Sequence, residues 1–349
     1  MKIFLAKSFL KCTDCEYNYN KIISIYEKAE KENCDLLIFP EMSITGFPIY
    51  DELLDINFLK NTENYIEKIV DFTKGKKTKI LLGCPYYIPE YISNEIIKKS
   101  QLFNSVVLIN DGYIDGISSK TTILKQNLFN EYKYFDKEIV LKNIKYEDNN
   151  FDVLISDDIM ENKNIFFIKD RDADFVVCLD CEIKKNIETK KQQLLKIAKW
   201  TNKNVIYLNT LSFDNKNNNS FLGESFIINN LGEIVYENQS INEDLIEFKT
   251  RIIDGKLVFE NTKKNQDEKH FLDIIAENYS NEEIIYEIKN QEKLPISKNI
   301  KFITFNKKYE NNNIEFIDFK KYFKNIDLDN NIKKIIINDL YKKIKLTFF

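Results

Sequence analysis

Asp35-Leu36-Leu37-Ile38-Phe39-Pro40-Glu41 is the stretch of sequence that decides the fold. Its near-continuous apolar run is typical of a strand buried on both faces, and Pro40 ends the strand because proline cannot donate to a sheet ladder. A carboxylate in the position of Glu41, directly after a buried strand, loses several kcal/mol of hydration free energy unless it has a partner. Taken alone, a glutamate at this position is more often an ordinary loop or helix-start carboxylate, and the other motifs of the chain change that balance.

The sequence on both sides of this strand alternates between strand and helix patterns. Residues 3–6 form a short apolar run, and residues 17–33 place Ile22, Tyr26 and Ala29 at helical spacing among charged side chains. The same alternation continues through a helix at 61–73, a strand at 80–82, a hairpin at 105–118 over Asp111-Gly112, strands at 151–155 and 175–179, a helix at 186–201, a strand at 205–208 and a hairpin at 226–236. This order predicts a layered α/β fold with partly parallel strands.

The composition excludes several classes of function. The 349 residues carry Lys+Arg 51 against Asp+Glu 55, a formal net charge of −4, which gives no electrostatic reason to expect nucleic acid as a partner. Glycine is scarce (Gly 8), and the sequence contains neither a Gly-rich dinucleotide fingerprint nor a phosphate-binding P-loop, so we expect no cofactor. The only histidine of the sequence is His270, in a polar run, so a mechanism that needs a histidine base or several imidazole ligands would depend on this one residue.

The sequence shows neither a membrane span nor a secretory signal. No apolar run approaches the roughly 20 residues of a membrane span, and the N-terminus turns polar too soon for a secretory signal. We therefore expect a cytoplasmic protein with no membrane partner, in which the six cysteines stay reduced.

Several motifs follow one another in order along residues 1–250. They are Phe39-Pro40-Glu41 with Thr45-Gly46-Phe47-Pro48, Asn104 in a strand, Lys120 after the Asp111-Gly112 hairpin, Phe129-Asn130-Glu131-Tyr132-Lys133-Tyr134-Phe135, and Phe221-Leu222-Gly223-Glu224-Ser225-Phe226. Together they resemble the carbon–nitrogen hydrolase (nitrilase) superfamily, most closely the glutaminase domain of glutamine-dependent NAD synthetases. The resemblance implies a nitrilase-type α-β-β-α four-layer sandwich.

The resemblance also implies a chemistry. The resembled enzymes use a glutamate as base, a lysine that stabilises the oxyanion and a cysteine as nucleophile. Glu41 and Lys120 match the first two roles, and Glu131 matches a second active-site glutamate. The roles are physically sound, because a carboxylate can take the proton of a thiol and an ammonium group can stabilise charge that develops on a carbonyl oxygen.

The nucleophile position departs from the resembled pattern. Where the family reads Leu-Ile-Cys-Glu-Asp-Ile-Trp, this chain reads Leu154-Ile155-Ser156-Asp157-Asp158-Ile159-Met160, so Ser156 stands in the cysteine position. Asp157 replaces the elbow glutamate, Gln126 replaces a tyrosine, and Asp180-Cys181-Glu182-Ile183 replaces the Ser-Ala-Ser-Pro stretch that helps to bind glutamine. A serine hydroxyl ionises far less readily than a thiol, so we expect natural loss of most amidase activity.

The cysteines leave two alternatives open. The pairs Cys12-x-x-Cys15 and Cys178-x-x-Cys181 could together supply four thiolate ligands to a zinc ion, although random pairing among six cysteines is the simpler explanation. Cys181 should lie in a loop that lines the pocket, so it could also substitute as nucleophile.

The end of the chain is predicted to be a separate segment. The polar run near residue 262 places the boundary so that residues 1–260 form the hydrolase-like domain and residues 261–349 a small C-terminal α/β extension, with strands at 301–305 and 333–337. Residues 256–349 contain no glycine, so the Ser-Gly-Gly loop of the resembled synthetases is absent and the extension cannot be their ATP-binding domain.

The sequence therefore favours a catalytically impaired carbon–nitrogen hydrolase that acts by binding a small amide-like ligand or by assembly, in a homo-oligomer. Two other hypotheses remain: an active amidase that uses Ser156 or Cys181 on a non-glutamine amide, and a zinc-stabilised interaction module.

Overall fold

The computed structural model describes residues 1–93, 96–124, 129–146, 149–214, 219–253 and 256–261, all of which lie in one compact unit, Met1–Glu268. The predicted C-terminal extension, with its two expected strands, lies outside the described residues apart from residue 261, so the domain boundary stays a prediction.

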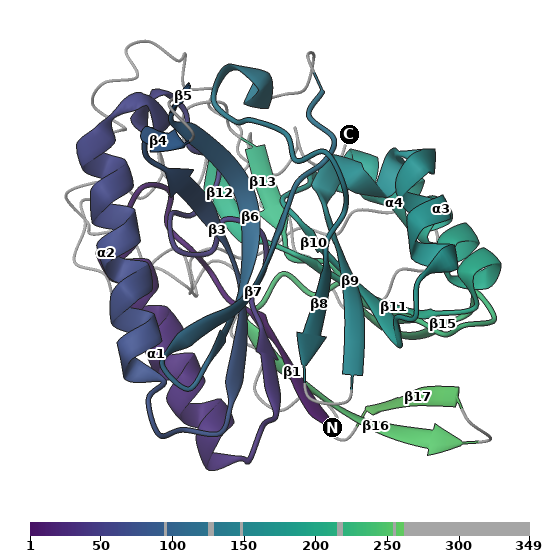
Figure 1. The fold of residues 1–349 in the computed structure, drawn as a ribbon. Helices are drawn as coiled ribbons and strands as arrows, with labels where there is room; N and C mark the ends of the chain where they lie inside the picture. Colours follow the sequence, from purple (N-terminus) through teal and green to yellow (C-terminus); the bar gives the residue numbers. More distant parts are fainter. Residues whose placement is uncertain (94–95, 125–128, 147–148, 215–218, 254–255, 262–349) are drawn as a thin grey trace, which may run out of the picture. The chain divides into compact units, whose positions relative to one another are not determined.

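Two β-sheets form the centre of this unit (Figure 1). The first is ordered β17-β16-β1-β2-β3-β6-β7 and the second β15-β14-β11-β10-β9-β8. The first sheet comprises β1 (Lys2–Lys7), β2 (Leu36–Ile38), β3 (Lys79–Ile88), β6 (Gln101–Asn110), β7 (Tyr113–Ser119), β16 (Asp244–Ile253) and β17 (Lys256–Asn261). The second comprises β8 (Asn143–Tyr146), β9 (Asn149–Ile155), β10 (Phe175–Asp180), β11 (Asn204–Asn209), β14 (Ser225–Ile228) and β15 (Ile234–Asn238).

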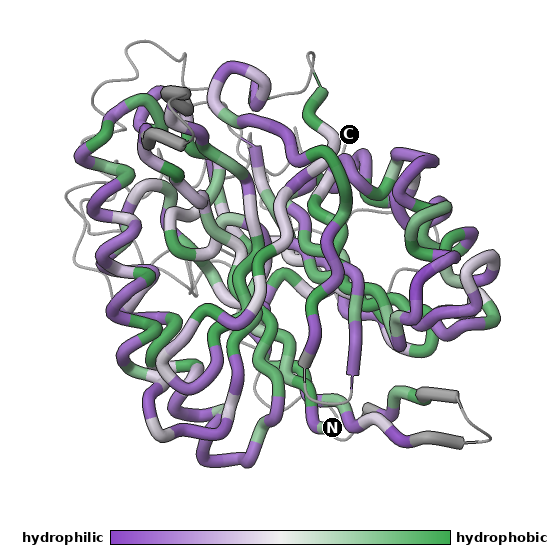
Figure 2. The backbone as a smooth tube through the Cα atoms, in the orientation of Figure 1, coloured by the Kyte–Doolittle hydropathy of each residue, from purple (hydrophilic) through white to green (hydrophobic). Residues whose placement is uncertain are grey.

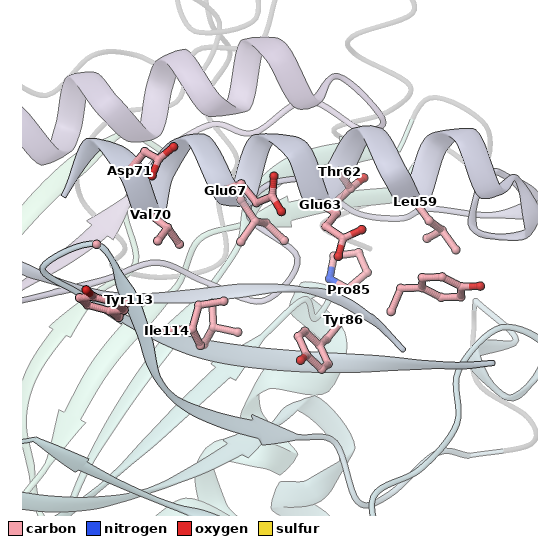
Figure 3. A pocket seen from close by; sticks show the side chains of 14 residues that line it. Leu59, Thr62, Glu63, Glu67, Val70, Asp71, Pro85, Tyr86, Tyr113 and Ile114 are labelled. Atoms are coloured by element: carbon pink, nitrogen blue, oxygen red, sulfur yellow. The ribbon is translucent and has the colours of Figure 1, made fainter. Parts of the chain in front are cut away.

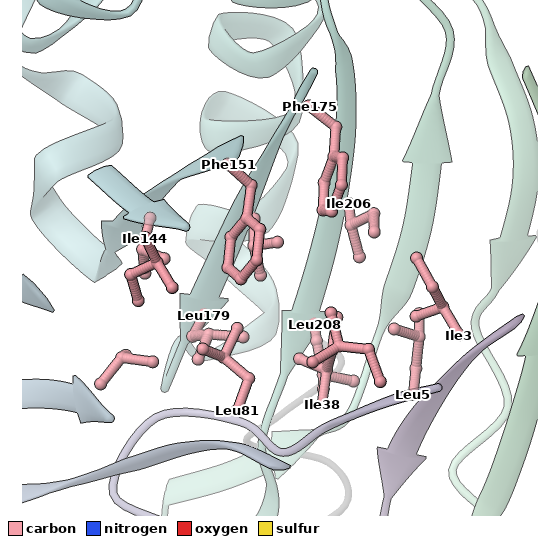
Figure 4. Close-up of a cluster of buried hydrophobic side chains, with 14 of the residues drawn as sticks. Ile3, Leu5, Ile38, Leu81, Ile144, Phe151, Phe175, Leu179, Ile206 and Leu208 are labelled. Atoms are coloured by element: carbon pink, nitrogen blue, oxygen red, sulfur yellow. The ribbon is translucent and has the colours of Figure 1, made fainter. Parts of the chain in front are cut away.

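The two sheets pack face to face because their strands alternate. In β1, Ile3 and Leu5 point between the sheets, whereas Phe4 and Ala6 point to the opposite face, as the two-residue period of a strand requires. Figure 4 shows this inter-sheet core, in which Phe151 and Phe175 stack with ring centroids 5.1 Å apart.

Helices cover the two outer faces. Helix α1 (Cys15–Lys31) and helix α2 (Ile56–Phe72) pack on the first sheet, and α3 (Asn162–Asp170) and α4 (Lys184–Thr201) pack on the second. Their outward faces are hydrophilic, while the strands between them are mostly hydrophobic (Figure 2). The expected α-β-β-α four-layer sandwich is confirmed.

Parallel pairing places the carboxyl ends of neighbouring strands at the same edge of each sheet. Strands β1, β2 and β3 pair in parallel, and so do β9, β10 and β11. Both expected hairpins are confirmed as β6–β7 and β14–β15, and Asp111 and Gly112 adopt positive φ values of 45° and 81° in the first turn. The sequence did not predict the ribbons β4 (Tyr91–Ser93) with β5 (Ile96–Lys98) and β12 (Leu211–Asp214) with β13 (Asn219–Leu222).

Gly46 marks a close approach of backbone in the loop that follows β2. Its φ is +67°, and a Cβ there would lie 2.1 Å from the carbonyl oxygen of Lys11. We expect Gly46→Ala to lower the free energy of unfolding by more than about 3 kcal/mol, since both strain and a backbone clash oppose the methyl group. Gly75→Ala is the matched control, because φ is +70° with nothing within 4 Å, and it should cost about 1 kcal/mol. Equal losses in urea unfolding would contradict this explanation.

Candidate active site

Glu41 lies at the carboxyl end of β2 and is 1% exposed. The backbone can enter this position because Gly83, on the neighbouring strand, has no side chain, and a Cβ there would lie 2.4 Å from the carbonyl oxygen of Pro40. The Asn104 Nδ2 donates to Glu41 Oε1 at 2.6 Å, whereas the buried Glu41 Oε2 and Asn104 Oδ1 have no hydrogen-bond partner. The carboxylate at the end of β2 is therefore fully buried.

Lys120 follows β7 and joins the predicted carboxylates into one buried cluster. Its Nζ lies 2.6 Å from Glu131 Oε2, 3.9 Å from Glu41 Oε1 and 3.4 Å from Asp157 Oδ2. Although burial opposes its charge, the carboxylates around it raise the pKa of Lys120 well above its ordinary value. Burial raises the pKa of Glu41 to about 8 despite the opposing effect of Lys120.

Ser156 begins a short 3-10 helix, η3 (Ser156–Met160), directly after β9. Its φ of +48° lies in the left-handed region and its exposure is 9%. The neighbouring Asp158 fixes this bend, because its carboxylate accepts the main-chain N–H groups of Ile155, Thr121 and Thr122 at 3.2, 3.0 and 2.8 Å. The serine is thus presented on a constrained bend between the ends of β9 and β7.

Lys190 is the site residue that sequence reasoning missed. It lies on α4, and its Nζ donates to Ser156 Oγ at 3.3 Å. The same Nζ pairs with Asp180 Oδ2 at 2.8 Å and with Glu182 Oε2 at 2.9 Å, and these carboxylates raise the pKa of Lys190 although its burial opposes this. The signal was present in the sequence, since position 190 falls on the buried face of the helix between Ile187 and Leu194.

The four cysteines of the zinc hypothesis have separate environments. Cys12 Sγ donates to the Phe47 carbonyl, Cys15 Sγ lies 3.5 Å from Thr62 Oγ1, Cys178 packs in the core beneath α4, and Cys181 Sγ donates to the Glu41 carbonyl. Within the described residues no group of three or more His, Cys, Asp and Glu side chains could hold a metal ion. The geometry therefore gives the zinc-stabilised module no support.

Cys181 does lie beside the cluster, as expected for a residue at the end of β10. Its thiol is buried, and burial together with Glu41 raises the pKa of Cys181 well above its ordinary value. Because the thiolate is the nucleophile, a thiol held in this way is a poor one.

A separate groove of about 520 Å³ lies on the outer side of the first sheet, between α2 and strands β3, β6 and β7 (Figure 3). It combines apolar side chains with three carboxylates that follow one another along α2. The lining residues are Leu59, Thr62, Glu63, Ile66, Glu67, Val70, Asp71, Pro85, Tyr86, Tyr87, Val107, Gly112, Tyr113 and Ile114. None of them belongs to the cluster around Glu41.

The profile of the family described as Carbon-nitrogen hydrolase matches residues 3–250. The chain therefore belongs to the carbon–nitrogen hydrolase family.

Known proteins agree with this assignment. The glutamine-dependent NAD(+) synthetase of Acinetobacter baylyi is 26% identical over 247 residues, which are 70% of this chain and 43% of that protein. The synthetase of Aquifex aeolicus is 29% identical over 137 residues, or 39% of this chain and 22% of the relative. This chain thus spans less than half the length of either protein.

Solved structures show the same fold. The glutamine-dependent NAD+ synthetase from Acinetobacter baumannii superimposes with a TM-score of 0.63 and 26% identity, covering 82% of this chain and 50% of that chain. An amidase of Nesterenkonia AN1 from the nitrilase superfamily gives a TM-score of 0.59 at 15% identity, with coverage of 71% of this chain and 89% of that chain.

No helix in the described part of the chain is long and apolar enough to cross a membrane.

Proposed function

We propose that this protein binds a small amide-like ligand at the Glu41–Lys120–Glu131 cluster and hydrolyses it poorly or not at all. Ser156, as proposed, stands where the family carries its cysteine nucleophile. The observation that carries the proposal is the environment of this serine: its hydroxyl accepts a hydrogen bond from the Lys190 ammonium group at 3.3 Å.

Three features of the site oppose attack by Ser156. A serine hydroxyl is a weak nucleophile until a base removes its proton. Lys190 cannot be that base, because the carboxylates of Asp180 and Glu182 raise its pKa and keep it protonated. Glu41 is a poor base at neutral pH, because burial raises its pKa to about 8 and leaves most of the carboxyl protonated.

The same site remains suited to binding. A primary amide offers a carbonyl oxygen as acceptor and two N–H donors. Lys120 is an ammonium donor at the centre of the cluster, and the buried Glu41 Oε2 and Asn104 Oδ1 are polar atoms without partners. Buried polar atoms of this kind are costly unless a ligand or water satisfies them, so they support a ligand-binding role.

Amide titration with ammonia detection tests the proposal. Butanamide should bind with a measurable Kd by calorimetry, whereas the unaltered protein should release no ammonia from butanamide or glutamine above the buffer blank. Glu131→Gln should weaken the binding about tenfold, since it removes the charge that holds Lys120 in place. Glu63→Gln, on the exposed face of α2, is the matched control and should bind as before.

Steady ammonia release by the unaltered protein would instead favour the active-amidase alternative. That alternative has one supporting observation, because an ammonium group beside Ser156 Oγ would stabilise a developing alkoxide. The homo-oligomer stays a prediction, which light scattering after size-exclusion chromatography would measure.

A further inference from the structure

The candidate site holds more negative than positive charge. Five carboxylates and two ammonium groups form two groups of ion pairs, one around Lys120 and one around Lys190. Ser156 lies between them, because its Oγ accepts from Lys190 and the next residue, Asp157, pairs with Lys120. The side chains of these charged groups are at most 15% exposed. The carboxylates are Glu41, Glu131, Asp157, Asp180 and Glu182, and the ammonium groups are Lys120 and Lys190. Among the residues that the structure describes, the contacts of the two lysines thus leave three carboxylates in excess.

Each lysine is shared by several carboxylates. The Lys120 Nζ lies 2.6 Å from Glu131 Oε2, 3.4 Å from Asp157 Oδ2 and 3.9 Å from Glu41 Oε1. Lys190 serves Asp180 and Glu182. Protonation of Glu41 offsets one negative charge at neutral pH, because burial raises its pKa to about 8.

Neutral hydrogen-bond donors stabilise the carboxylates without neutralising their negative charge. Asp180 accepts hydrogen bonds from the Tyr207 hydroxyl at 2.9 Å and from the Cys181 main-chain N–H at 2.9 Å. Glu182 accepts the N–H of Ile183 at the start of α4. Asp157 and Glu182 are the most exposed members of the set, at 15% and 14%, so they are the carboxylates that a charged ligand reaches most easily.

A second observation points to a ligand. Glu41 Oε2 and Asn104 Oδ1 lie in the same set and are buried without a hydrogen-bond partner. Excess negative charge in a poorly solvated place is stabilised most by a cation. Asn104 Oδ1 needs an N–H donor, whereas the protonated Glu41, whose Oε1 accepts from Asn104, carries its proton on Oε2 and can donate it to a carbonyl oxygen, so the two atoms together match a primary amide. No three of the described acidic groups are arranged to hold a metal ion, so an organic cation matches the site better.

We propose that the ligand is a cationic carboxamide, a small molecule that carries an ammonium group together with its amide. The amide lies at Lys120 and Asn104, and the ammonium group faces Asp157 and Glu182. This inference rests on the proposed function, which assigns the amide group of the ligand. It adds that the rest of the ligand carries a positive charge. The same carboxylates disfavour an anionic amide, because like charges repel in a poorly solvated site.

Three ligands of similar size separate these ideas: 4-aminobutanamide is cationic, pentanamide is its neutral isostere, and succinamate is anionic. We expect 4-aminobutanamide to bind the full-length protein about tenfold more tightly than pentanamide in about 0.05 M salt, with a smaller ratio in about 0.5 M salt. Succinamate should bind more weakly than pentanamide. Butylamine, which has no amide, should bind more weakly than 4-aminobutanamide.

Two variants test where the preference arises. Asp157→Asn and Glu182→Gln should each reduce the ratio of the two Kd values at least about threefold, whereas Glu63→Gln should leave the ratio unchanged. Equal binding of the cationic and neutral amides, or preference for succinamate, would overturn the cationic-ligand proposal and leave the proposed function standing. If none of the amides binds, the proposed function itself fails, and this inference fails with it.

Discussion

The Ser156→Cys variant should release ammonia from small amides at least about 100-fold faster than the unaltered protein. A thiol near neutral pH is already a few per cent thiolate and needs much less help from a base than a hydroxyl does. The Lys190 ammonium group that faces Ser156 Oγ at 3.3 Å would further stabilise the thiolate. Ammonia release from butanamide and glutamine, measured with both proteins side by side, gives the result directly.

The pH profile of this variant has a defined direction. Glu41 must be ionised to take the thiol proton, and burial raises its pKa to about 8. The rate should therefore rise from about pH 6 to about pH 8 and level off above that. Ser156→Ala is the control and should stay inactive throughout. An inactive Ser156→Cys variant that still binds butanamide would show that the machinery around Glu41 has also decayed.

The Lys120→Met variant should lose about 3–5 kcal/mol of unfolding free energy, the second large effect that we expect. The Lys120 side chain is 1% exposed, and its Nζ lies 2.6 Å from Glu131 Oε2. Removal of the ammonium group leaves buried carboxylates without a cation, and that penalty exceeds the value of the ion pair itself. Urea unfolding of both proteins at two pH values measures the loss.

The loss should grow with pH. Without Lys120 the pKa of Glu41 rises further, so the folded variant keeps a proton that the unfolded chain releases above about pH 4.3. Both proteins lose stability from this carboxyl between about pH 5 and pH 8. The difference between them widens only above about pH 8, where the unaltered protein releases the Glu41 proton and the variant keeps it. Lys133→Met is a matched control, because its ion pair with Asp51 has the same 2.6 Å separation but is exposed, and stability should barely change. Similar losses in the two variants would contradict the proposed role of burial.

Much of the scaffold was predictable because its strands are buried on both faces. Such strands read as continuous apolar runs, as in residues 35–39 and 205–208, and helix α1 showed its buried face through Ile22, Tyr26 and Ala29. Helix α2 begins at Ile56, earlier than expected, because Asp55 caps it by accepting the N–H of Asn57. Strands β16 and β17 were not predicted, because charged residues interrupt their apolar residues and neither sequence alternates clearly.

The site was only partly predictable. Glu41, Lys120 and Glu131 come together, as the resemblance to carbon–nitrogen hydrolases implies. Lys190 belongs to a helix face, and in the sequence a lysine there resembles the solvated lysines around it. Its place on the helix face of Ile187 and Leu194 indicates burial, and its contacts with Asp180 and Ser156 in three dimensions identify it as a residue of the site.

The backbone conformation at Ser156 is fixed by Asp158 and not by the Ser156 side chain. The Asp158 carboxylate ties Ile155 on one side to Thr121 and Thr122 on the other, so the backbone path is set by a neighbour and by main-chain groups. The side chain at position 156 can thus be exchanged without rebuilding the scaffold. Most serine codons lie a single base from a cysteine codon, so the proposed function implies that one mutation at position 156 would supply the thiol without altering the backbone that presents it.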